Sequence, residues 1–374
     1  MKIVINLLPY TNYSGVETVV KNLVIWMKKE FPQDDLVILK HTLSPEFLHF
    51  KDLDLKEEII YIKKRRRGIL AILQQIKIYS ILKRLKPDIL LSLSPSAPFF
   101  YSRNVIMIHD CAYDKYPEFT SFLSKIYSKL MYYVAKFLAK KIITISEFSK
   151  KELINLYKIK PDKIEVIYLG PPELPEIDVK FLSQTLTKFK LVNKKYFIYV
   201  GNTRPRKNIP GLLKAFQMFL EENHGFYMVL VGKIDNKFVD LDQEIKNLKL
   251  KNNVIRTGFV TDEEKVALYK GAIALTFPSY YEGFGLPVLE AQSLGIPVLT
   301  SNNSSLPEVA GDDSVVWVDP YKVENIFIGI KKITFDKKLR ENLIKKGYEN
   351  VKRFSWVNAA HRMIDIVRNI ITEK

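Results

Sequence analysis

The sequence contains little cysteine and no long apolar run, and each shortage excludes a class of protein. Cys111 is the single cysteine among 374 residues, so the chain has no internal disulfide and fits a reducing compartment. No stretch approaches the roughly 18–20 apolar residues needed to span a bilayer. The opening residues, MKIVINLLPY, contain too short an apolar stretch for a signal peptide. We therefore expect a cytoplasmic protein, with the inner face of the cell membrane as a second location.

Charge and hydrophobic residues, by contrast, are plentiful. Hydrophobic residues make up 47% of the chain and charged residues 26%, so it can bury large cores. Its length fits two domains of roughly 100–200 residues each. The formal net charge of +17 favours anionic partners such as phosphates, lipid headgroups or nucleic acid. The alternative is a lysine-rich composition without a mechanistic role, because only localised charge is informative.

Short buried strands alternate with helical patterns, and this alternation begins again once along the chain. The first series of predicted strands comprises 2–8, 88–93, 104–109, 141–146 and 163–169. The second comprises 195–201, 227–232, 253–258, 272–277, 296–301 and 315–319. Such alternation predicts βαβ units and parallel sheets. The expected fold is α/β, with two Rossmann-like domains that face each other across a cleft.

Local signals add a linker and a helix start to this outline. The segment LGPPELPEID, between the two series, carries three prolines and has the composition of a linker. Ser149 and Glu152 have the spacing of a capping box and predict a helix that starts at Ser149. In a parallel α/β sheet, ligands bind outside the carboxyl ends of the strands. The residues that follow the strands are therefore the candidates for a site.

The stretch YYEGFGLPVLE, residues 280–290, follows a predicted strand and begins a helix. Pro287 suits the first helical turn, where a missing N–H costs nothing. The loop glycines expose backbone donors and the helix N-terminus adds partial positive charge, which together make an anion site. Glu282 in the loop and Glu290 in the helix can both face the cleft. Carboxylates beside an anion site suit a sugar nucleotide; the alternative is a turn with two surface glutamates.

Three further places follow predicted strands. In GNTRPRKN, residues 201–208, guanidinium and ammonium groups can neutralise a diphosphate, the alternative being a solvated basic loop. His109 and Asp110 end a strand of the first domain, and Gly15 follows the first strand. Taken singly, these last residues favour a structural role over a functional one.

Together these stretches resemble a known family. The segments ISEFSKKEL, IYLG, GNTRPRKN, LVGK, TGFVTDEE, FPSYYEGFGLPVLEAQSLGIPVLTSNNSSLPEVAGD and FSW are similar to those of retaining GT-B glycosyltransferases of family 4, also called group 1. Within that family the chain most resembles bacterial mannosyl- and rhamnosyltransferases of surface polysaccharide synthesis. The resemblance implies an N-terminal acceptor domain (1–170), a linker (171–194), a C-terminal donor domain (195–354) and a terminal helix (355–374) that crosses back to the first domain.

In the donor domain, the resemblance implies roles for named residues. Glu282 would hold a hydroxyl of the donor sugar and balance positive charge that develops at its anomeric carbon. Arg206 and Lys207 would bind the diphosphate and stabilise it as it leaves, and Glu290 would bind the ribose hydroxyls. The remaining donor contacts would be the backbone of Gly283, Phe284 and Gly285 at the sugar, Val288 and Leu289 near the phosphates, and Gly232 and Val260 near the base.

In the first domain, the resemblance implies that His109 touches the donor sugar, with Asp110 beside it. Gly15 would line the junction of donor and acceptor. Many relatives have two adjacent glycines where this chain has Ser14-Gly15, so the contacts of that loop stay open. Position 204 is often acidic in this branch, and the role of Arg204 is unassigned.

The implied reaction moves a hexose from a nucleoside diphosphate sugar, with GDP-mannose as the leading donor, to a glycan acceptor that we expect to be lipid-linked. Configuration would be retained, and the departing phosphate would take the acceptor's proton on the same face of the sugar. Neither a cofactor nor a metal is expected. The two Asp-x-Asp strings, Asp52-Leu53-Asp54 and Asp240-Leu241-Asp242, do not follow clean buried strands. The sequence does not distinguish guanine from uracil or thymine.

Two alternative functions compete with this one. A nicotinamide enzyme would need a third glycine after Gly283 and Gly285, where this chain has Val288. A sugar-nucleotide or lipid-binding module without turnover would use the same pockets and stays open as the alternative. Nucleic acid is not expected, because the basic residues follow no binding motif.

A basic stripe on one predicted helix raises the question of membrane contact. Within residues 119–141, Lys125, Lys129, Lys136 and Lys140 fall on one side of a helix. Phe122, Tyr132 and Tyr133 are expected to flank this stripe, whereas Ile126, Leu130, Val134 and Leu138 are expected to turn elsewhere. Lysines beside aromatic residues favour contact with anionic lipid, and the run Lys63–Arg67 adds charge to the same domain. The alternative, a solvated face on a core helix, stays open.

Overall fold

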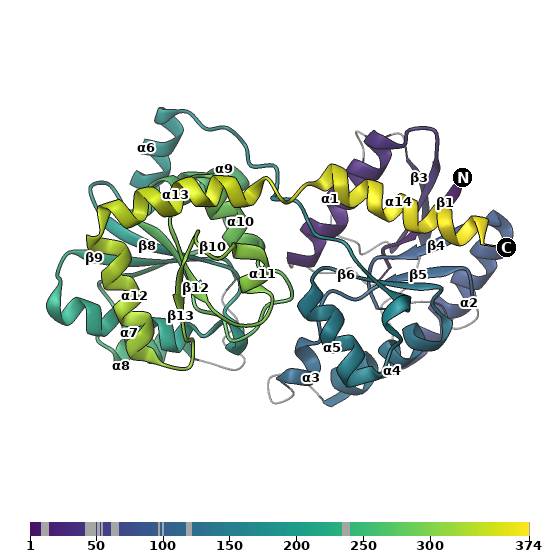
Figure 1. Ribbon diagram of the computed structural model, residues 1–374, viewed down its shortest axis with the longest axis horizontal. Helices are drawn as coiled ribbons and strands as arrows, with labels where there is room; N and C mark the ends of the chain where they lie inside the picture. Colours follow the sequence, from purple (N-terminus) through teal and green to yellow (C-terminus); the bar gives the residue numbers. More distant parts are fainter. Residues whose placement is uncertain are drawn as a thin grey trace. The chain divides into compact units, whose positions relative to one another are not determined.

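The computed structural model describes residues 1–8, 15–41, 50, 53, 55–60, 67–95, 98, 101–116, 122–233 and 240–373. For residues 67–75 and 122–124 it describes the backbone alone. The chain forms two compact units, each with its own core (Figure 1). The first unit comprises Met1–Gly170 and Ser355–Lys374, and the second comprises Pro171–Phe354.

The first unit is built on a parallel sheet with strand order β3-β2-β1-β4-β5-β6-β7. Its described strands are β1 (Lys2–Asn6), β2 (Asp35–His41), β3 (Lys56–Ile60), β4 (Ile89–Ser92), β5 (Asn104–Met107), β6 (Lys141–Thr144) and β7 (Ile164–Val166). The central strands β4 and β5 are buried along their whole length, as expected when helices cover both faces of a parallel sheet.

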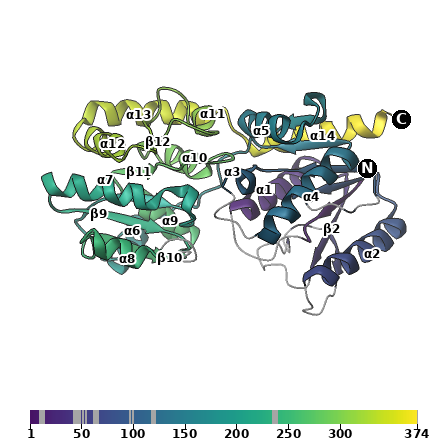
Figure 2. The same ribbon diagram turned by 90° about the horizontal axis from the view of Figure 1, so that it is seen from below.

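Helices lie on both faces of this sheet (Figure 1). They are α1 (Gly15–Glu30), α2 (Arg67–Leu85), α3 (Ala112–Lys115), α4 (Phe122–Leu138), α5 (Glu147–Tyr157) and α14 (Trp356–Thr372). The terminal helix α14 packs on α1, and Figure 2 looks onto the opposite face, which carries α2 and α4. The buried side of α14 consists of Trp356, Ala359, Ala360, Met363, Ile364, Ile366 and Val367.

Two features of the first unit correct the sequence-based expectation. The strands β2 and β3 were not predicted: β3 is an edge strand with mostly exposed residues, and β2 ends in the polar pair Lys40–His41, which breaks its apolar pattern. The helix α5 is capped by Ser146 rather than Ser149. The Ser146 hydroxyl accepts a hydrogen bond from the Ser149 N–H at 3.1 Å, so the cap lies three residues before Ser149 and the helix begins at Glu147.

The second unit repeats this architecture with strand order β10-β9-β8-β11-β12-β13, also parallel throughout its described part. The strands are β8 (Lys195–Val200), β9 (Phe226–Val231), β10 (Val254–Gly258), β11 (Ala274–Phe277), β12 (Val298–Ser301) and β13 (Val316–Val318). Each matches one strand of the predicted second series, with β9 beginning one residue earlier than expected, so the series is confirmed. The expected α/β fold with two Rossmann-like domains is therefore present.

The helices of the second unit form two groups, one on each face of the sheet. On one face lie α7 (Ile209–Glu222), α8 (Leu241–Asn247) and α12 (Val323–Phe335). On the other lie α6 (Val179–Lys188), α9 (Asp262–Lys270), α10 (Leu286–Ser293) and α13 (Lys337–Val351), with α11 (Leu306–Ala310) beside α10. The segment 171–194, expected to be a linker, thus contains a helix: α6 packs on α9 and belongs to the second unit.

Candidate active site

The strand order of the second unit reverses between β8 and β11, and the loops that follow these two strands flank that point. Such a switch point is where open α/β sheets bind their ligands. The loop after β8 is basic, and the loop after β11 contains Glu282. At the end of β9, Gly232 has a φ of +120°, and a Cβ there would lie 2.4 Å from the carbonyl oxygen of Gly201. A side chain is therefore excluded where these two strand ends meet.

A buried ion-pair cluster joins the two loops. The Lys207 ammonium lies 2.5 Å from Glu282 Oε1, and Arg206 Nη1 lies 3.1 Å from Glu282 Oε2. Arg206 Nη1 also donates to the Tyr281 carbonyl at 2.7 Å, and the Arg206 carbonyl accepts from the Tyr280 N–H at 2.8 Å. The side chains of Lys207 and Glu282 are only 9% and 6% exposed. The sequence-predicted Arg206, Lys207 and Glu282 are thus brought together.

Charge balance in this cluster leaves a positive surplus. Burial alone would raise the pKa of Glu282, but the nearby cations of Lys207 and Arg206 outweigh burial and hold that pKa below its usual value. The carboxylate is therefore ionised at neutral pH, and two cations face one anion. Two cations beside one carboxylate, in a largely buried place of low effective dielectric, favour an anionic ligand such as a diphosphate.

The glycine loop is held in shape by two serines from the segment before α11. The Ser304 hydroxyl accepts a hydrogen bond from the Glu282 N–H at 3.1 Å. The Ser305 hydroxyl lies 2.9 Å and 3.0 Å from the carbonyl oxygens of Glu282 and Phe284, to which it donates. Gly285 then adopts a left-handed conformation (φ +107°) as the N-cap of α10, and Pro287 lies in the first turn as predicted. This fixes the direction in which the α10 N-terminus points.

Glu290 is buried on α10 and binds partners of its own. Its Oε1 lies 3.1 Å from Lys265 Nζ, and its Oε2 accepts a hydrogen bond from the Tyr269 hydroxyl at 2.9 Å. Sequence reasoning missed Lys265 and Tyr269. Their i, i+4 spacing on α9 was a readable signal that they share a face, but nothing in the sequence pointed that face at Glu290.

Most of the other predicted donor-binding residues have buried side chains, so a ligand would contact their backbone atoms. Phe284 is buried and packs edge-on against Phe354, with ring centroids 5.7 Å apart. The side chains of Val288 and Leu289 are fully buried, and the Val288 N–H donates to the Gly285 carbonyl. Val260 is half-buried in the loop between β10 and α9. Arg204 is exposed, apart from the ion-pair cluster.

In the first unit, His109 and Asp110 follow β5. His109 is buried, and its Nε2 lies 3.0 Å from the Leu93 carbonyl, so that nitrogen carries the proton. Burial lowers the pKa of His109, which is therefore neutral at pH 7, and its Nδ1 has no hydrogen-bond partner among the described residues. Asp110 accepts from the Ala112 N–H at 3.0 Å and so stabilises the start of α3. Gly15 is the first residue of α1.

The Asp-x-Asp strings are engaged elsewhere or lie outside the described residues, as Asp52 and Asp54 do. Asp240 caps α8 through the Gln243 N–H, and Asp242 forms an ion pair with Arg256 at 2.7 Å. Ser14 and residues 63–66 of the basic run also lie outside the described part.

The helix α4 exposes a face different from the expected one. Five large apolar side chains are 42–71% exposed; this α4 apolar face consists of Ile126, Tyr127, Leu130, Tyr133 and Phe137. Ile126 and Leu130, expected to turn away from the lysine stripe, are thus on the exposed face, and the prediction that Tyr132 flanks an exposed stripe was wrong. Tyr132 is buried and donates to the Asp110 carbonyl, because the core side of α4 consists of Met131, Tyr132 and Ala135. Of the lysines, Lys129 and Lys140 are exposed, whereas Lys125 and Lys136 are half-buried.

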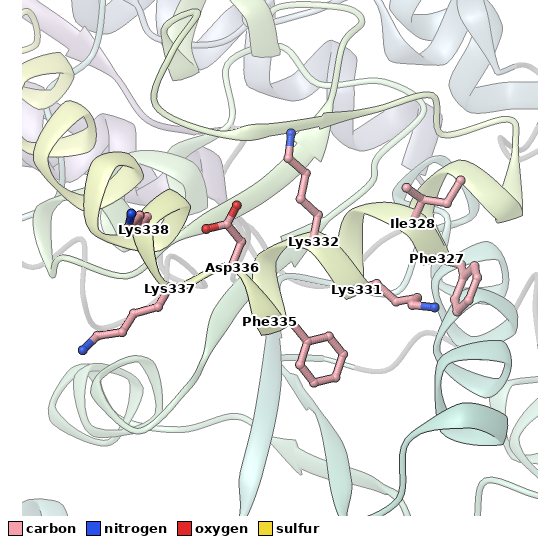
Figure 3. A pocket seen from close by; sticks show the side chains of 8 residues that line it. All are labelled: Phe327, Ile328, Lys331, Lys332, Phe335, Asp336, Lys337 and Lys338. Carbon is pink, nitrogen blue, oxygen red and sulfur yellow. The ribbon is translucent and has the colours of Figure 1, made fainter.

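A separate pocket lies where α12 meets α13 and contains none of the predicted site residues (Figure 3). It combines exposed apolar side chains with lysines; its lining is Phe327, Ile328, Lys331, Lys332, Phe335, Asp336, Lys337 and Lys338. Ile328 and Phe335 are 58% and 59% exposed, comparable to the α4 apolar face.

Two descriptions of known protein families match the chain. Residues 13–171 match the family described as Glycosyltransferase Family 4, and residues 185–350 match Glycosyl transferases group 1. The chain belongs to the family 4 (group 1) glycosyltransferases. The match of the second model includes the ion-pair cluster, the glycine loop and Glu290.

Relatives of this glycosyltransferase family member include O-antigen mannosyltransferases. The chain is 36% identical over 181 residues to O-antigen chain mannosyltransferase B of Escherichia coli, covering 48% of this chain and 47% of that protein. It is 28% identical over 192 residues to O-antigen chain mannosyltransferase RfbU of Salmonella typhimurium, covering 50% and 49%. These alignments span about half the length of the curated relatives.

Solved structures share the fold over the whole chain. Anabaena Alr3699/HepE in complex with UDP and glucose has a TM-score of 0.80 at 17% identity, covering 99% of this chain and all of that one. WaaG, a glycosyltransferase involved in lipopolysaccharide biosynthesis, has a TM-score of 0.76 at 15% identity, covering 98% and 99%. The likeness shows the GT-B fold. Within the described residues, no helix has the length and hydropathy to cross a membrane.

Proposed function

We propose that this protein is a hexosyltransferase that moves a sugar, with mannose from GDP-mannose as the first choice, from a nucleoside diphosphate to a glycan acceptor in surface polysaccharide synthesis. The observation that carries the proposal is the buried cluster of Lys207, Arg206 and Glu282 at the switch point of the second unit. Its surplus positive charge matches a diphosphate, and its carboxylate matches a sugar hydroxyl. The names of the O-antigen mannosyltransferase relatives support the choice of sugar and pathway.

The chemistry asked of the protein is mainly electrostatic. The bond from the anomeric carbon to the diphosphate oxygen breaks, and the acceptor oxygen bonds to that carbon on the same face. The proton of the acceptor hydroxyl moves to the departing phosphate, so no protein base is needed. Lys207 and Arg206 would stabilise the charge on the leaving diphosphate, and Glu282 the positive charge on the sugar. The positive end of α10 lies beside the same loop.

The test is a transfer assay combined with a matched pair of variants. Thermal shifts with GDP-mannose, UDP-glucose and dTDP-rhamnose identify the donor, because a bound ligand raises the melting temperature. With that donor and a lipid-linked glycan acceptor, Lys207→Met should lower turnover by about 10²–10³, the usual cost of one electrostatic contact to a leaving group. The control is Lys214→Met, which changes an exposed lysine on α7.

Three outcomes would count against the proposal. Wild-type turnover in Lys207→Met would remove the assigned diphosphate contact, provided that circular dichroism shows both variants folded. Donor binding without release of nucleoside diphosphate in the presence of acceptors would favour the alternative, a non-catalytic sugar-nucleotide-binding module. Loss of activity on addition of EDTA would overturn metal independence.

We further propose that the α4 apolar face contacts the anionic surface of the cell membrane, where a lipid-linked acceptor would be found. Isoleucine, leucine and aromatic side chains of this face are about half exposed or more, which is costly in water. Lys129 lies beside them on the helical wheel and the exposed Lys140 follows two residues after α4 ends, so the face is complementary to negatively charged lipid. The proposal commits to a bilayer, because an acidic protein would not require so broad an apolar stripe.

Vesicle sedimentation tests this contact. The wild-type protein should bind vesicles of phosphatidylglycerol and phosphatidylcholine, and lose binding in pure phosphatidylcholine or in high salt. Lys129→Gln/Lys140→Gln should weaken binding roughly 30-fold, at about 1 kcal/mol per lysine near an anionic surface. Leu130→Gln/Phe137→Gln should weaken it as well. The matched control is Ile328→Gln/Phe335→Gln, equally exposed beside lysines in the α12–α13 pocket. Equal loss in the control, or indifference to lipid charge, would contradict the proposal.

A further inference from the structure

The helix α9 supplies two hydrogen-bond donors to one buried carboxylate. Lys265 Nζ lies 3.1 Å from Glu290 Oε1, and the Tyr269 hydroxyl donates to Glu290 Oε2 at 2.9 Å. Glu290 is 7% exposed and Tyr269 is fully buried. Each carboxylate oxygen of Glu290 thus has its own donor, and the two contacts together fix the plane of the carboxylate.

With these two contacts made, the Glu290 carboxylate can still accept further hydrogen bonds. Its two oxygens offer about four lone-pair sites, and the contacts from α9 occupy one on each oxygen. One site on each oxygen stays available for a donor that approaches from another direction. Two hydroxyls on adjacent carbons, such as the 2′ and 3′ hydroxyls of a ribose, have the spacing to use both.

We propose that Lys265 and Tyr269 are positioning residues that hold Glu290 ready for the ribose hydroxyls of the donor nucleotide. This inference rests on the proposed function, since it takes the donor to be a sugar nucleotide. It adds two residues that act through Glu290 and so determine the preference for a ribonucleotide over a deoxyribonucleotide.

A purely structural role explains these contacts less well, because α9 is anchored without them. Its first turn has a capping box, with Thr261 and Glu264 bonded reciprocally at 3.1 and 3.2 Å. Glu264 also pairs with Lys188 of α6. Besides Tyr269, the buried side of the helix is supplied by Val266, Ala267 and Leu268.

The side chain of Lys265 stays protonated beside Glu290. Burial alone would lower the pKa of Lys265, but Glu290 and Asp262 outweigh burial and raise that pKa. Asp262 itself is 73% exposed, 3.0 Å from the ammonium, so the carboxylate that most needs the cation is the buried Glu290. A methionine at position 265 would fill similar space without holding Oε1.

The experiment compares nucleotides that differ only in the ribose. Calorimetry would measure binding of GDP and of 2′,3′-dideoxy-GDP, and of the corresponding UDP pair, to the full chain. The wild type should prefer the ribose form by about tenfold to a hundredfold, as expected for hydrogen bonds to a charged acceptor. Lys265→Met and Tyr269→Phe should each reduce that ratio toward one, and Lys265→Arg should preserve most of it.

Controls separate the inference from the function on which it rests. Lys270→Met changes an exposed lysine on the same helix and should leave the ratio unchanged, whereas Glu290→Gln should abolish it. If Glu290→Gln abolishes the ratio but Lys265→Met and Tyr269→Phe retain it in full, the positioning role is wrong and the proposed function stands. Equal wild-type affinity for both nucleotides overturns the inference alone. Absence of binding to either nucleotide overturns both. Tyr269→Phe, which removes one oxygen atom, provides the readout if Lys265→Met does not fold.

Discussion

Glu282 illustrates how much one side chain contributes to both stability and chemistry. Its carboxylate contacts both Lys207 and Arg206, so its removal leaves the buried Lys207 without that partner. A buried pair that loses one member is destabilised by more than the pair contributed, because the remaining charge is poorly solvated. The residues proposed for chemistry therefore also stabilise the loops on which they lie.

We expect Glu282→Gln to lower the free energy of unfolding of the second unit by about 3–5 kcal/mol at pH 7. The pKa of Glu282 is lowered in the folded protein, so its stabilisation is complete above the ordinary value of 4.5 and is lost as pH falls through the lowered pKa. The difference between wild type and variant should therefore shrink as the pH falls below 4.5. Urea unfolding, followed by proteolysis and mass spectrometry of residues 195–354, measures it.

The control for this prediction is Glu263→Gln, which removes an exposed carboxylate from α9. It should alter the free energy of unfolding by no more than about 0.5 kcal/mol at either pH, as surface substitutions usually do. A Glu282→Gln variant as stable as wild type at pH 7 would contradict the assigned ion pairs.

Sequence reasoning found the residues of the cluster and missed those around Glu290. Arg206, Lys207 and Glu282 follow strands, and the parallel fold brings the ends of neighbouring strands together, so composition and topology were enough. Lys265 and Tyr269 lie inside a helix, and their side chains reach Glu290 only because of how α9 packs beside α10. Such a contact depends on helix rotation, which a single sequence does not fix.

At the scale of elements, periodicity predicted where helices form better than which side they bury. The pattern identified α4, yet a helical wheel cannot tell an apolar side that faces the core from one that faces outward. In this helix the core side includes Ala135, whose small size permits close packing, and the larger Leu130 and Phe137 lie outside. The strand β3 was missed for a related reason, since Glu57 and Glu58 give an edge strand the composition of a loop.

The whole chain divides into two units, and the first of them is built from two separate segments of the sequence. The terminal helix α14 packs on α1, with His361 2.9 Å from Glu30 and Arg362 2.8 Å from Glu165. Its buried side chains include Met363, Ile364 and Val367, each worth about 1.5–3 kcal/mol on burial. Because a domain is stable by only about 5–15 kcal/mol, the first unit depends on residues from the far end of the sequence.

A chain that ends at Phe354 should therefore lose the folded first unit and keep the second. Hydrogen exchange followed by mass spectrometry should show lost protection in residues 1–170 and unchanged protection in 195–354. A chain that ends at Thr372 retains all of α14 and should match wild type. Full protection of residues 1–170 in the shorter chain would show that α14 contributes little.

The close approach of Gly232 to Gly201 has a consequence for engineering donor choice. Main chain touches main chain at this point, so the turn after β9 cannot be moved without displacing the turn that leads into the basic loop. If these turns contact the base and the diphosphate, as the family resemblance implies, reshaping the first to change which base is accepted would alter the diphosphate contact at the same time. Base selectivity and turnover would then change together, and side chains farther along the neighbouring loops would be the better place to change one without the other.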